Sequence, residues 1–367
     1  MGTCLRTRHR ALALAAAIVA GTGCDSEPAP TPLDPSYHVK GGFLRDPDGR
    51  ALLLRGLNLA GGHKQAPYLD FQQPPDYVRV KDPWGMNAVR FLLTWAAIEP
   101  AEGVYDDVIV GFDPMNEPYW GSYVIVAFES DLLQPLYEQI VAAVRAERPG
   151  WVAFLEPAAS RNLGIPTSLG RFPFADVMYA PHSYDRDAES GMGFDATHRD
   201  AVLQNGADLA VEATALGAGL WIGEYGGQTG TPGITPYMDA EYAAFAASAA
   251  GTTYWSYDRG GGYSVLDADG NEKPDLMAVL VRPWPERVAG TPVSYAFDAG
   301  TDTFTLTYHP DPAMILPTVI RVPDRVYPNG YTVDCSGCAT ESAPGELRVT
   351  RPPVTTGGAP AVVTLRP

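Results

Sequence analysis

Two glutamates at the ends of apolar segments carry the chemistry that this sequence suggests. Glu117 belongs to residues 111–118 (Gly-Phe-Asp-Pro-Met-Asn-Glu-Pro), directly after the apolar run 108–110. Glu224 belongs to residues 220–226 (Leu-Trp-Ile-Gly-Glu-Tyr-Gly). Each pattern predicts a buried strand that ends in a carboxylate. Two such carboxylates suit a double displacement at a sugar carbon, in which one protonates the leaving oxygen and the other attacks the ring.

Charged and hydroxyl groups near the other predicted strand ends would tune these two carboxylates. Arg90 lies inside the apolar segment 87–95, and a buried arginine needs carboxylate partners. We expect Arg90 and the hydroxyl of Tyr184 to keep Glu224 ionised as the nucleophile. We expect burial and the neighbouring carboxylate to raise the pKa of Glu117, the acid/base. The alternative for Arg90 is a structural ion pair in the barrel wall.

Three more side chains have the chemistry to contact a sugar. Asn116 is placed to bond the sugar 2-hydroxyl, a contact that strengthens in the transition state. His182 has the chemistry to bond either the sugar or the acid/base. Trp255 offers a flat face for the sugar ring. Taken singly, His182 also fits a satisfied core histidine and Trp255 a core aromatic residue, so the prediction depends on all of them standing at strand ends.

The elements that position these residues alternate between buried strands and helices. Strands are predicted at 51–60, 87–95, 108–110, 151–159, 176–185, 220–224 and 252–258, and helices at 77–86, 130–147, 196–217 and 239–250. In helix 130–147 we expect Leu132, Leu133, Leu136, Ile140, Val141 and Val144 on the core face. Alternation of this kind predicts a parallel sheet, and a (β/α) barrel gathers its active site at the carboxyl ends of the strands. The segment 59–64 lacks the glycine-rich turn of an open nucleotide-binding sheet.

The chain divides into four predicted regions. Residues 1–23 form a signal peptide with basic Arg6, Arg8 and Arg10 and a short apolar core, and residues 24–36 form a disordered tether. Residues 37–285 form the barrel, and residues 286–367 form a small C-terminal β-sandwich of short alternating strands. Residues 37–48 read as a hairpin at the start of the barrel region.

The cysteines and the charge bear on location and partners. Gly21-Thr22-Gly23 before Cys24 is similar to a lipoprotein signal, so we expect lipidation of Cys24 in a bacterial cell-envelope lipoprotein; the alternative is ordinary cleavage and secretion. Cys335 and Cys338 are predicted to close a small disulfide loop. The net charge of −17 argues against nucleic acid and against electrostatic docking on anionic lipid. We expect a monomer that meets a membrane only through its lipid anchor, with no cofactor and no metal.

Four motifs carry a resemblance to a known family. They are residues 111–118, 180–185 (Ala-Pro-His-Ser-Tyr-Asp), 222–226 (Ile-Gly-Glu-Tyr-Gly) and 255–258 (Trp-Ser-Tyr-Asp), with 282–285 and 288–292 at the passage into the sandwich. On these residues the chain resembles glycoside hydrolase family 5, and within it the endoglycoceramidase-like branch, from about Tyr37 to Cys338. The resemblance implies a (β/α)8 barrel that hydrolyses the bond between a β-linked glycan and ceramide or a similar lipid. It implies Glu117 as acid/base and Glu224 as nucleophile, with a subsite formed by Arg90, Asn116, His182, Tyr184 and Trp255.

One segment of the family pattern is missing between Asp106 and Val108. Family members carry there a helix, a third barrel strand and a further helix, and a crossover of that kind needs at least about a dozen residues. The barrel is therefore expected to lack about one β/α unit, with a gap beside Arg90 and Glu117 that admits water and weakens the activity. Two alternatives to glycolipid hydrolysis remain. They are a β-glucanase or β-glucosidase of the same barrel, and a catalytically impaired surface lipoprotein that binds glycans.

Overall fold

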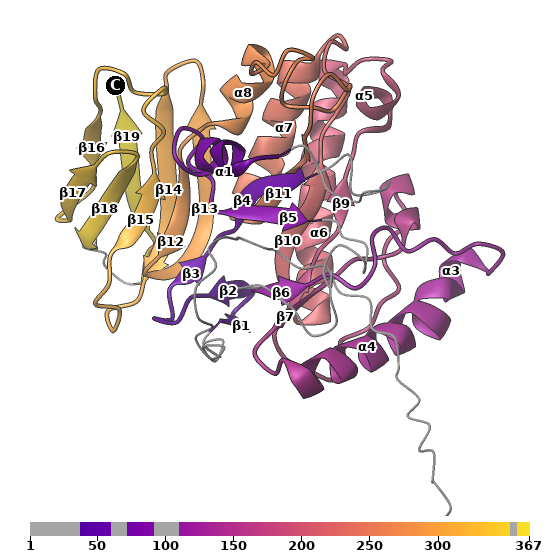
Figure 1. Cartoon of the computed structure of the whole chain (residues 1–367). Coiled ribbons are helices and arrows are strands. Elements are labelled where there is room, and N and C mark those ends of the chain that lie inside the picture. Colours follow the sequence, from indigo (N-terminus) through magenta and orange to yellow (C-terminus); the bar gives the residue numbers. More distant parts are fainter. Residues whose placement is uncertain (1–36, 60–71, 92–109, 353–357) are drawn as a thin grey trace, which may run out of the picture.

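The computed structural model describes residues 37–59, 72–91, 110–352 and 358–367. The predicted signal peptide, Cys24 and the predicted tether lie outside these residues, as do positions 92–95 and 108–109 of two predicted strands. Figure 1 shows two parts, a sheet flanked by helices and a body of antiparallel strands that includes the C-terminus.

The first part is built on a curled parallel sheet of order β5-β4-β11-β10-β8-β7-β6, in which β9 pairs with β10. Its strands are β4 (Arg55–Leu59), β5 (Ala88–Phe91), β6 (Gly111–Phe112), β7 (Val152–Leu155), β8 (Val177–Tyr179), β9 (His182–Ser183), β10 (Gly219–Tyr225) and β11 (Gly251–Tyr257). Every pairing in it is parallel. All carboxyl ends therefore meet at one edge, where a barrel places its chemistry.

In the part of the chain that the structure describes, the sheet is open between its two end strands, β5 and β6. Among the described residues no strand pairs with the outer edge of β5 or of β6. A cavity of about 1100 Å³ lies along this opening, and its lining includes Val89 and Arg90 of β5, Phe112 of β6 and Phe154 of β7. The opening stands where a third barrel strand is expected, in agreement with a barrel that lacks about one β/α unit.

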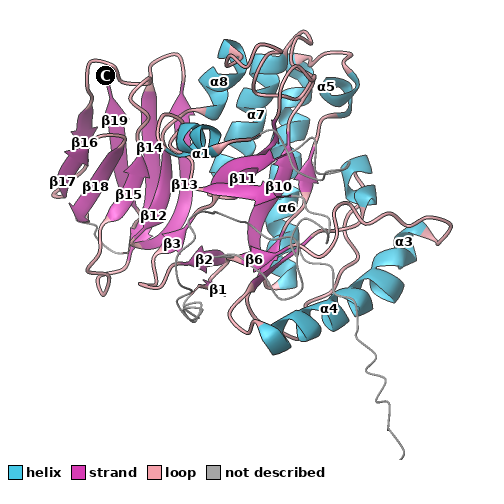
Figure 2. Ribbon diagram, viewed as in Figure 1, coloured by secondary structure: helices cyan, strands magenta, loops and turns pink. Residues whose placement is uncertain are grey.

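Helices cover the outer face of the sheet (Figure 2). The α-helices are α1 (Pro74–Lys81), α3 (Ile125–Phe128), α4 (Gln134–Glu147), α5 (Arg186–Ser190), α6 (Arg199–Leu216), α7 (Ile234–Ala247) and α8 (Pro274–Leu280). A π-helical turn, η2 (Glu129–Leu133), precedes α4, and the 3-10 turns are η3 (Ala159–Leu163) and η4 (Ala196–His198). In the described part of the chain, no helix is both long and apolar enough to span a membrane.

The predicted core face of helix 130–147 is right only in part. Leu133, Val141 and Val144 are buried, but Leu132 and Leu136 are exposed. They lie four residues apart and therefore on one flank of the helix. In a complete barrel the helix of the preceding β/α unit would cover a flank of this helix, so their exposure agrees with the expected lack of that unit.

The second part contains two antiparallel sheets. One has the order β1-β2-β3-β12-β15-β18-β17 and the other β13-β14-β19-β16. The N-terminal strands are β1 (His38–Lys40), β2 (Phe43–Arg45) and β3 (Ala51–Leu52). The later strands are β12 (Trp284–Val288), β13 (Gly290–Asp298), β14 (Thr303–Pro310), β15 (Thr318–Arg321), β16 (Thr332–Asp334), β17 (Ala339–Ala343), β18 (Glu346–Arg351) and β19 (Ala361–Arg366). A disulfide joins Cys335 and Cys338 between β16 and β17.

Two sequence boundaries differ from the structure. The sequence predicts the N-terminal hairpin as part of the barrel region 37–285, but β3 pairs with β12, so these first strands complete a sandwich sheet. The predicted strand 51–60 is in fact two strands, since β3 belongs to the sandwich and β4 to the barrel. Sequence periodicity missed the break because all of residues 51–54 are apolar. The sequence predicts six sandwich strands, at 294–297, 303–308, 318–322, 330–334, 347–350 and 361–365, and the described part of the chain adds β12 and β17 to them.

Candidate active site

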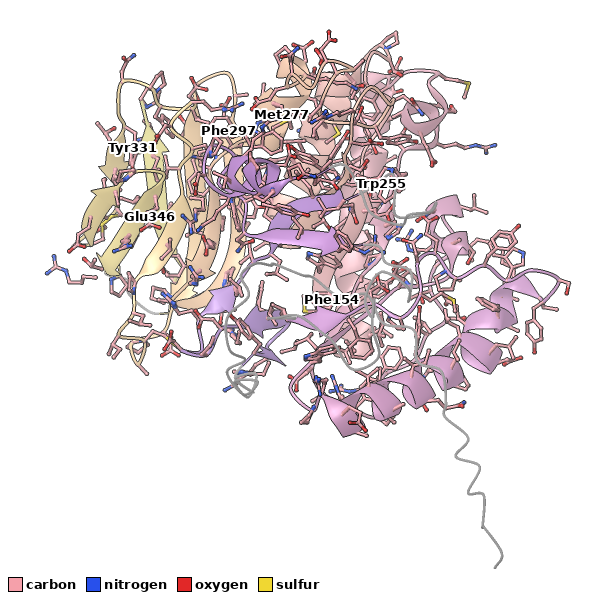
Figure 3. All side chains as sticks on the ribbon, in the orientation of Figure 1. Phe154, Trp255, Met277, Phe297, Tyr331 and Glu346 are labelled. Carbon is pink, nitrogen blue, oxygen red and sulfur yellow. A yellow bond between two sulfur atoms is a disulfide. The ribbon has the colours of Figure 1, made fainter. Side chains whose placement is uncertain are left out.

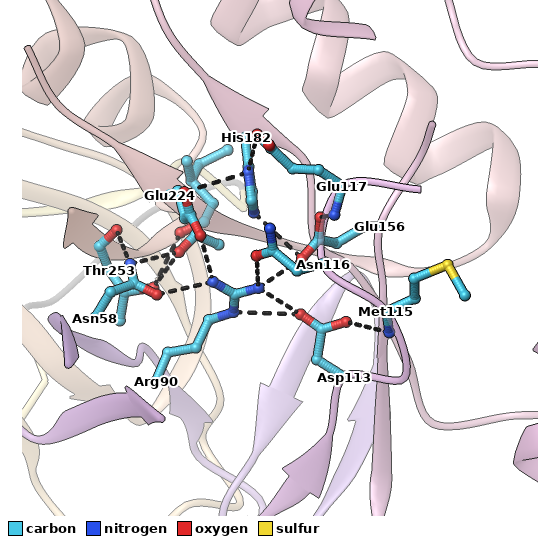
Figure 4. Close-up of polar contacts among 12 residues, drawn as sticks. Asn58, Arg90, Asp113, Met115, Asn116, Glu117, Glu156, His182, Glu224 and Thr253 are labelled. Carbon is cyan, nitrogen blue, oxygen red and sulfur yellow. Dashed lines mark hydrogen bonds and ion pairs between the residues drawn. The ribbon is translucent and has the colours of Figure 1, made fainter. Parts of the chain in front are cut away.

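Arg90 is the centre of the cluster at the carboxyl ends of the strands (Figure 4). Its Nη1 donates to Glu224 Oε1 at 2.7 Å and to Asn58 Oδ1 at 2.9 Å. Its Nη2 donates to Glu156 Oε1 at 2.6 Å and to Asp113 Oδ2 at 3.0 Å. The side chain is only 6% exposed, so these acceptors replace the water that a guanidinium would otherwise bind.

Asp113 and Glu156 share this buried site but hold their protons differently. Burial and the charge of Glu156 raise the pKa of Asp113 well above its usual range. Burial also opposes the ionisation of Glu156, but His182 and Arg90 outweigh it and lower the pKa of Glu156 to about 2. Within the pair, Asp113 is therefore the carboxyl that holds a proton more readily, and Glu156 is the one that carries the negative charge.

His182 connects the buried cluster to Glu117. Its Nδ1 lies 2.9 Å from Glu117 Oε1, and its Nε2 lies 3.2 Å from Glu156 Oε1, an ion-pair distance without good hydrogen-bond direction. Burial alone would lower the pKa of His182, but Glu156, Glu224 and the hydrogen bond to Glu117 raise it to about 10. The imidazole is thus a cation at neutral pH and donates to Glu117.

The acid/base candidate differs from the expectation in one respect. The pKa of Glu117 is lowered, not raised, chiefly because His182 donates a hydrogen bond to its carboxylate. Its side chain is 37% exposed, so the opposing effect of burial is too small to prevail. Asn162 of η3 adds a second donor, with its Nδ2 3.0 Å from Glu117 Oε1. The backbone of Glu117 has a φ of 44°, a left-handed conformation that is uncommon for residues other than glycine and recurs at functional sites.

The two predicted catalytic carboxylates face each other across this cluster. One oxygen of Glu117, one of Glu224 and a ring nitrogen of His182 all lie within 4.8 Å of one another. Tyr184 donates its hydroxyl to Glu224 Oε2 at 2.8 Å, so both predicted contacts of Glu224, with Arg90 and with Tyr184, are present.

Asn116 and Trp255, two of the three predicted sugar contacts, also lie at this edge. Asn116 is exposed, and its Oδ1 accepts from Arg90 Nη2 at 2.8 Å, which orients its amide. Trp255 belongs to β11, is half-buried, and is followed by a cis peptide bond to Ser256. Figure 3 shows Trp255 on the barrel side of the molecule, away from the sandwich strands.

Sequence reasoning missed several members of the cluster. The buried side chain of Asn58 also belongs to the cluster. Its Nδ2 donates to the carbonyl of Gly223 at 2.9 Å, and its Oδ1 accepts from Arg90. Asp113 lies within the motif 111–118 and Glu156 within the predicted strand 151–159, but the sequence pattern alone indicates no role for either. Asn162 has no sequence signal, because a 3-10 turn brings it to Glu117 from another segment.

The atoms of Glu117, His182 and Glu224 also have the spacing of metal ligands. A metal would need a lone pair on the His182 nitrogen, and the raised pKa keeps a proton on each ring nitrogen at neutral pH. Glu117, His182 and Glu224 are therefore better described as an ion-paired, hydrogen-bonded group than as a metal centre.

A parallel barrel with two opposed glutamates at its strand ends defines a class of carbohydrate-active proteins, and two family models agree with it. The model described as cellulase, glycosyl hydrolase family 5, matches residues 99–261, and the glycoside hydrolase family 5 C-terminal domain matches residues 282–363. The chain belongs to glycoside hydrolase family 5.

Individual relatives refine this placement. The chain is 27% identical to endoglycoceramidase I of Rhodococcus hoagii over 278 residues, which cover 70% of this chain and 53% of the relative. It is 24% identical to a glucosylceramidase of Rhizopus delemar, over 56% of this chain and 40% of the relative. The chain thus spans about half the length, or less, of these two curated relatives.

A solved structure shows the same fold. Endo-glycoceramidase II from Rhodococcus sp., in a complex with ganglioside GM3, superposes with a TM-score of 0.78 and 24% identity. The superposition covers 89% of this chain and 100% of the solved one. The expected barrel followed by a C-terminal β-sandwich is thereby confirmed.

Proposed function

We propose that this protein is a retaining glycoside hydrolase that cleaves the β-glycosidic bond between an oligosaccharide and ceramide or a similar lipid. The observation that carries the proposal is the separation of Glu117 and Glu224, whose nearest oxygens lie within 4.8 Å. A retaining enzyme keeps its carboxyls about 5 Å apart for direct attack, whereas an inverting enzyme needs room for a water between them. The endoglycoceramidase relatives support the lipid aglycone.

In the proposed reaction Glu224 attacks the anomeric carbon while Glu117 gives its proton to the glycosidic oxygen. The lipid alcohol leaves, and the sugar is held as an ester of Glu224. Glu117, now ionised, takes a proton from water, whose oxygen displaces Glu224 and restores both groups. Arg90 and Tyr184 hold Glu224 in position, and Asn116, oriented by Arg90, is placed to donate to the sugar 2-hydroxyl.

Two alternatives keep specific support. The match to the cellulase model fits a β-glucanase or β-glucosidase. The open edge beside Arg90 fits an impaired protein that binds glycans without turnover. Export, with Cys24 as a lipid anchor or as part of a free secreted chain, remains a prediction, and the disulfide Cys335–Cys338 is of the kind formed in oxidising compartments.

Incubation with a ganglioside tests the function. We expect mass spectrometry to detect free oligosaccharide and free ceramide with the parent protein and neither with Glu224→Ala. Release of glucose or short oligosaccharides only from a β-glucan or an aryl β-glucoside would favour the first alternative. Glycan binding that is unchanged by Glu224→Gln, without any release, would favour the second.

The pH profile should reveal the lowered pKa of Glu117. An acid catalyst acts only while protonated, so kcat/KM should fall as pH rises through a value below the ordinary glutamate pKa. Asn162→Ala removes a donor to the carboxylate, so the pKa of Glu117 should rise and this basic limb should move to higher pH. Asn205→Ala is the matched control, since Asn205 bonds Ser183 instead. A basic limb that stays in place in Asn162→Ala would contradict the role of this contact.

A further inference from the structure

An uncharged apolar surface follows the acid/base directly in the chain. Residues 118–128 contain no Asp, Glu, Lys or Arg. Within them Tyr119, Val124 and Val126 are 66%, 63% and 65% exposed, and Tyr123 is exposed as well. We call Tyr119, Tyr123, Val124 and Val126 the 119–126 patch. Apolar residues scattered singly over a surface are ordinary, but several within eight residues of one loop and helix indicate an interaction surface.

The segment is held in a defined shape. Tyr119 and Trp120 stack with ring centroids 4.1 Å apart, and the hydroxyl of Tyr123 donates to Asp131 at 3.0 Å. Pro118, which separates Glu117 from Tyr119, accepts a hydrogen bond from the backbone of Ala159 at 2.9 Å. In Figure 1 the loop before α3 projects from the barrel on the side away from the sandwich strands. The patch is therefore an ordered projection beside the candidate site.

The position of the patch indicates its partner. The acid/base protonates the leaving oxygen, so the leaving group must lie beside Glu117. Tyr119 follows Glu117 by only two residues in the chain, which favours a position of the patch on the side where the aglycone departs. Aromatic side chains with a polar tip, such as tyrosine, gather at membrane–water interfaces, and exposed valines beside them suit the layer just below the headgroups.

We propose that the 119–126 patch docks the protein onto a lipid bilayer of low surface charge, so that a membrane-borne glycolipid enters the site headgroup first. This inference rests on the proposed function for the identity of the substrate, whereas the vesicle-binding test does not depend on that function. The patch has no cation to attract anionic lipid, and the chain carries a net charge of −17, so zwitterionic lipid is the favoured partner. This contact would be separate from an acyl group on Cys24.

Binding to phosphatidylcholine vesicles tests the proposal. All proteins carry Cys24→Ser in the full chain, so that no acyl group is attached and every variant has the same N-terminus. The test variant combines Tyr119→Ser, Val124→Ser and Val126→Ser. The matched control combines Met192→Ser, Val211→Ser and Ile315→Ser, three exposed apolar residues at separate places. All six positions are exposed, so both variants should fold, and circular dichroism and thermal melting check this.

We expect the parent and the control to sediment with the vesicles. The test variant should bind at least about tenfold more weakly, because its three serine side chains would bury less apolar area in the bilayer than the residues they replace. Hydrolysis of a vesicle-borne ganglioside should fall by a similar factor, while hydrolysis of a soluble aryl β-glucoside should not change. The proposal is overturned if the parent does not bind, if the control loses as much binding, or if binding requires anionic lipid. It is also overturned if Leu132→Ser/Leu136→Ser abolishes binding and the test variant does not.

The two proposals fail separately. Vesicle binding that depends on the patch, in a protein that hydrolyses no glycoside, would retain the docking surface and reject the proposed function. Hydrolysis of both substrates with no vesicle binding would retain a glycosidase and reject the docking surface.

Discussion

Glu224→Ala is expected to lower the turnover of every glycoside substrate by roughly 10,000-fold or more, because in the proposed mechanism Glu224 is the group that forms the glycosyl ester. Glu117→Ala should behave differently. It should reduce ganglioside hydrolysis by about 100- to 10,000-fold, the range for a lost general acid. Glycosyl transfer from a dinitrophenyl β-glycoside should be affected far less, because that leaving group departs without a proton. Stopped-flow release of dinitrophenol would measure this first step.

Azide separates the two roles by stereochemistry. In Glu117→Ala azide should replace water in the second displacement and yield a β-glycosyl azide. In Glu224→Ala it should attack from the vacated face and yield an α-glycosyl azide. Glu147→Ala, at an exposed position near the end of α4, is the control and should match the parent. An α product from Glu117→Ala, or equal loss on both substrates in the two variants, would contradict the assignment.

Arg90→Met is expected to have the largest effect on stability. The substitution keeps much of the volume but leaves Asp113, Glu156 and Glu224 without their shared cation. Removing one partner of a buried ion cluster costs about 3–5 kcal/mol in the free energy of unfolding. The melting temperature should fall by roughly 5–10 °C for a chain of this size, and activity should be lost as well. Arg90→Lys should be intermediate, because an ammonium cannot replace the guanidinium fork that bridges these acceptors.

Arg199→Met provides the matched control. Arg199 also forms an ion pair, with its Nη1 3.1 Å from Asp239 Oδ2, but its side chain is 41% exposed. A surface pair of this kind contributes at most about 1 kcal/mol, so its loss should barely change the urea midpoint. Equal midpoints for Arg90→Met and the parent would show that the cluster is not the structural centre of the barrel.

Much of the site could be predicted because the end of each strand is visible in the local sequence pattern. An apolar run followed by a polar residue locates Glu117, Glu224 and His182 without knowledge of their neighbours. The fold class follows from the same local signal, since alternating strands and helices leave few arrangements other than a parallel sheet. The lack of one β/α unit could also be predicted from the sequence, because the chain between two motifs is too short to contain that unit.

Local pattern did not predict which groups meet or what charge they carry. Asn162 reaches Glu117 from another segment, and the opposite pKa shifts of Asp113 and Glu156 depend on distances that only packing sets. The pKa of Glu117 was expected in the wrong direction for the same reason. Burial and a neighbouring acid raise a carboxyl pKa. The structure instead leaves the side chain of Glu117 partly exposed and places the cationic His182 2.9 Å from its carboxylate. The residue types in this sequence determined the chemistry that the site can hold. The tertiary structure decided the electrostatics, because a pKa depends on the few ångströms between groups that are far apart in the chain.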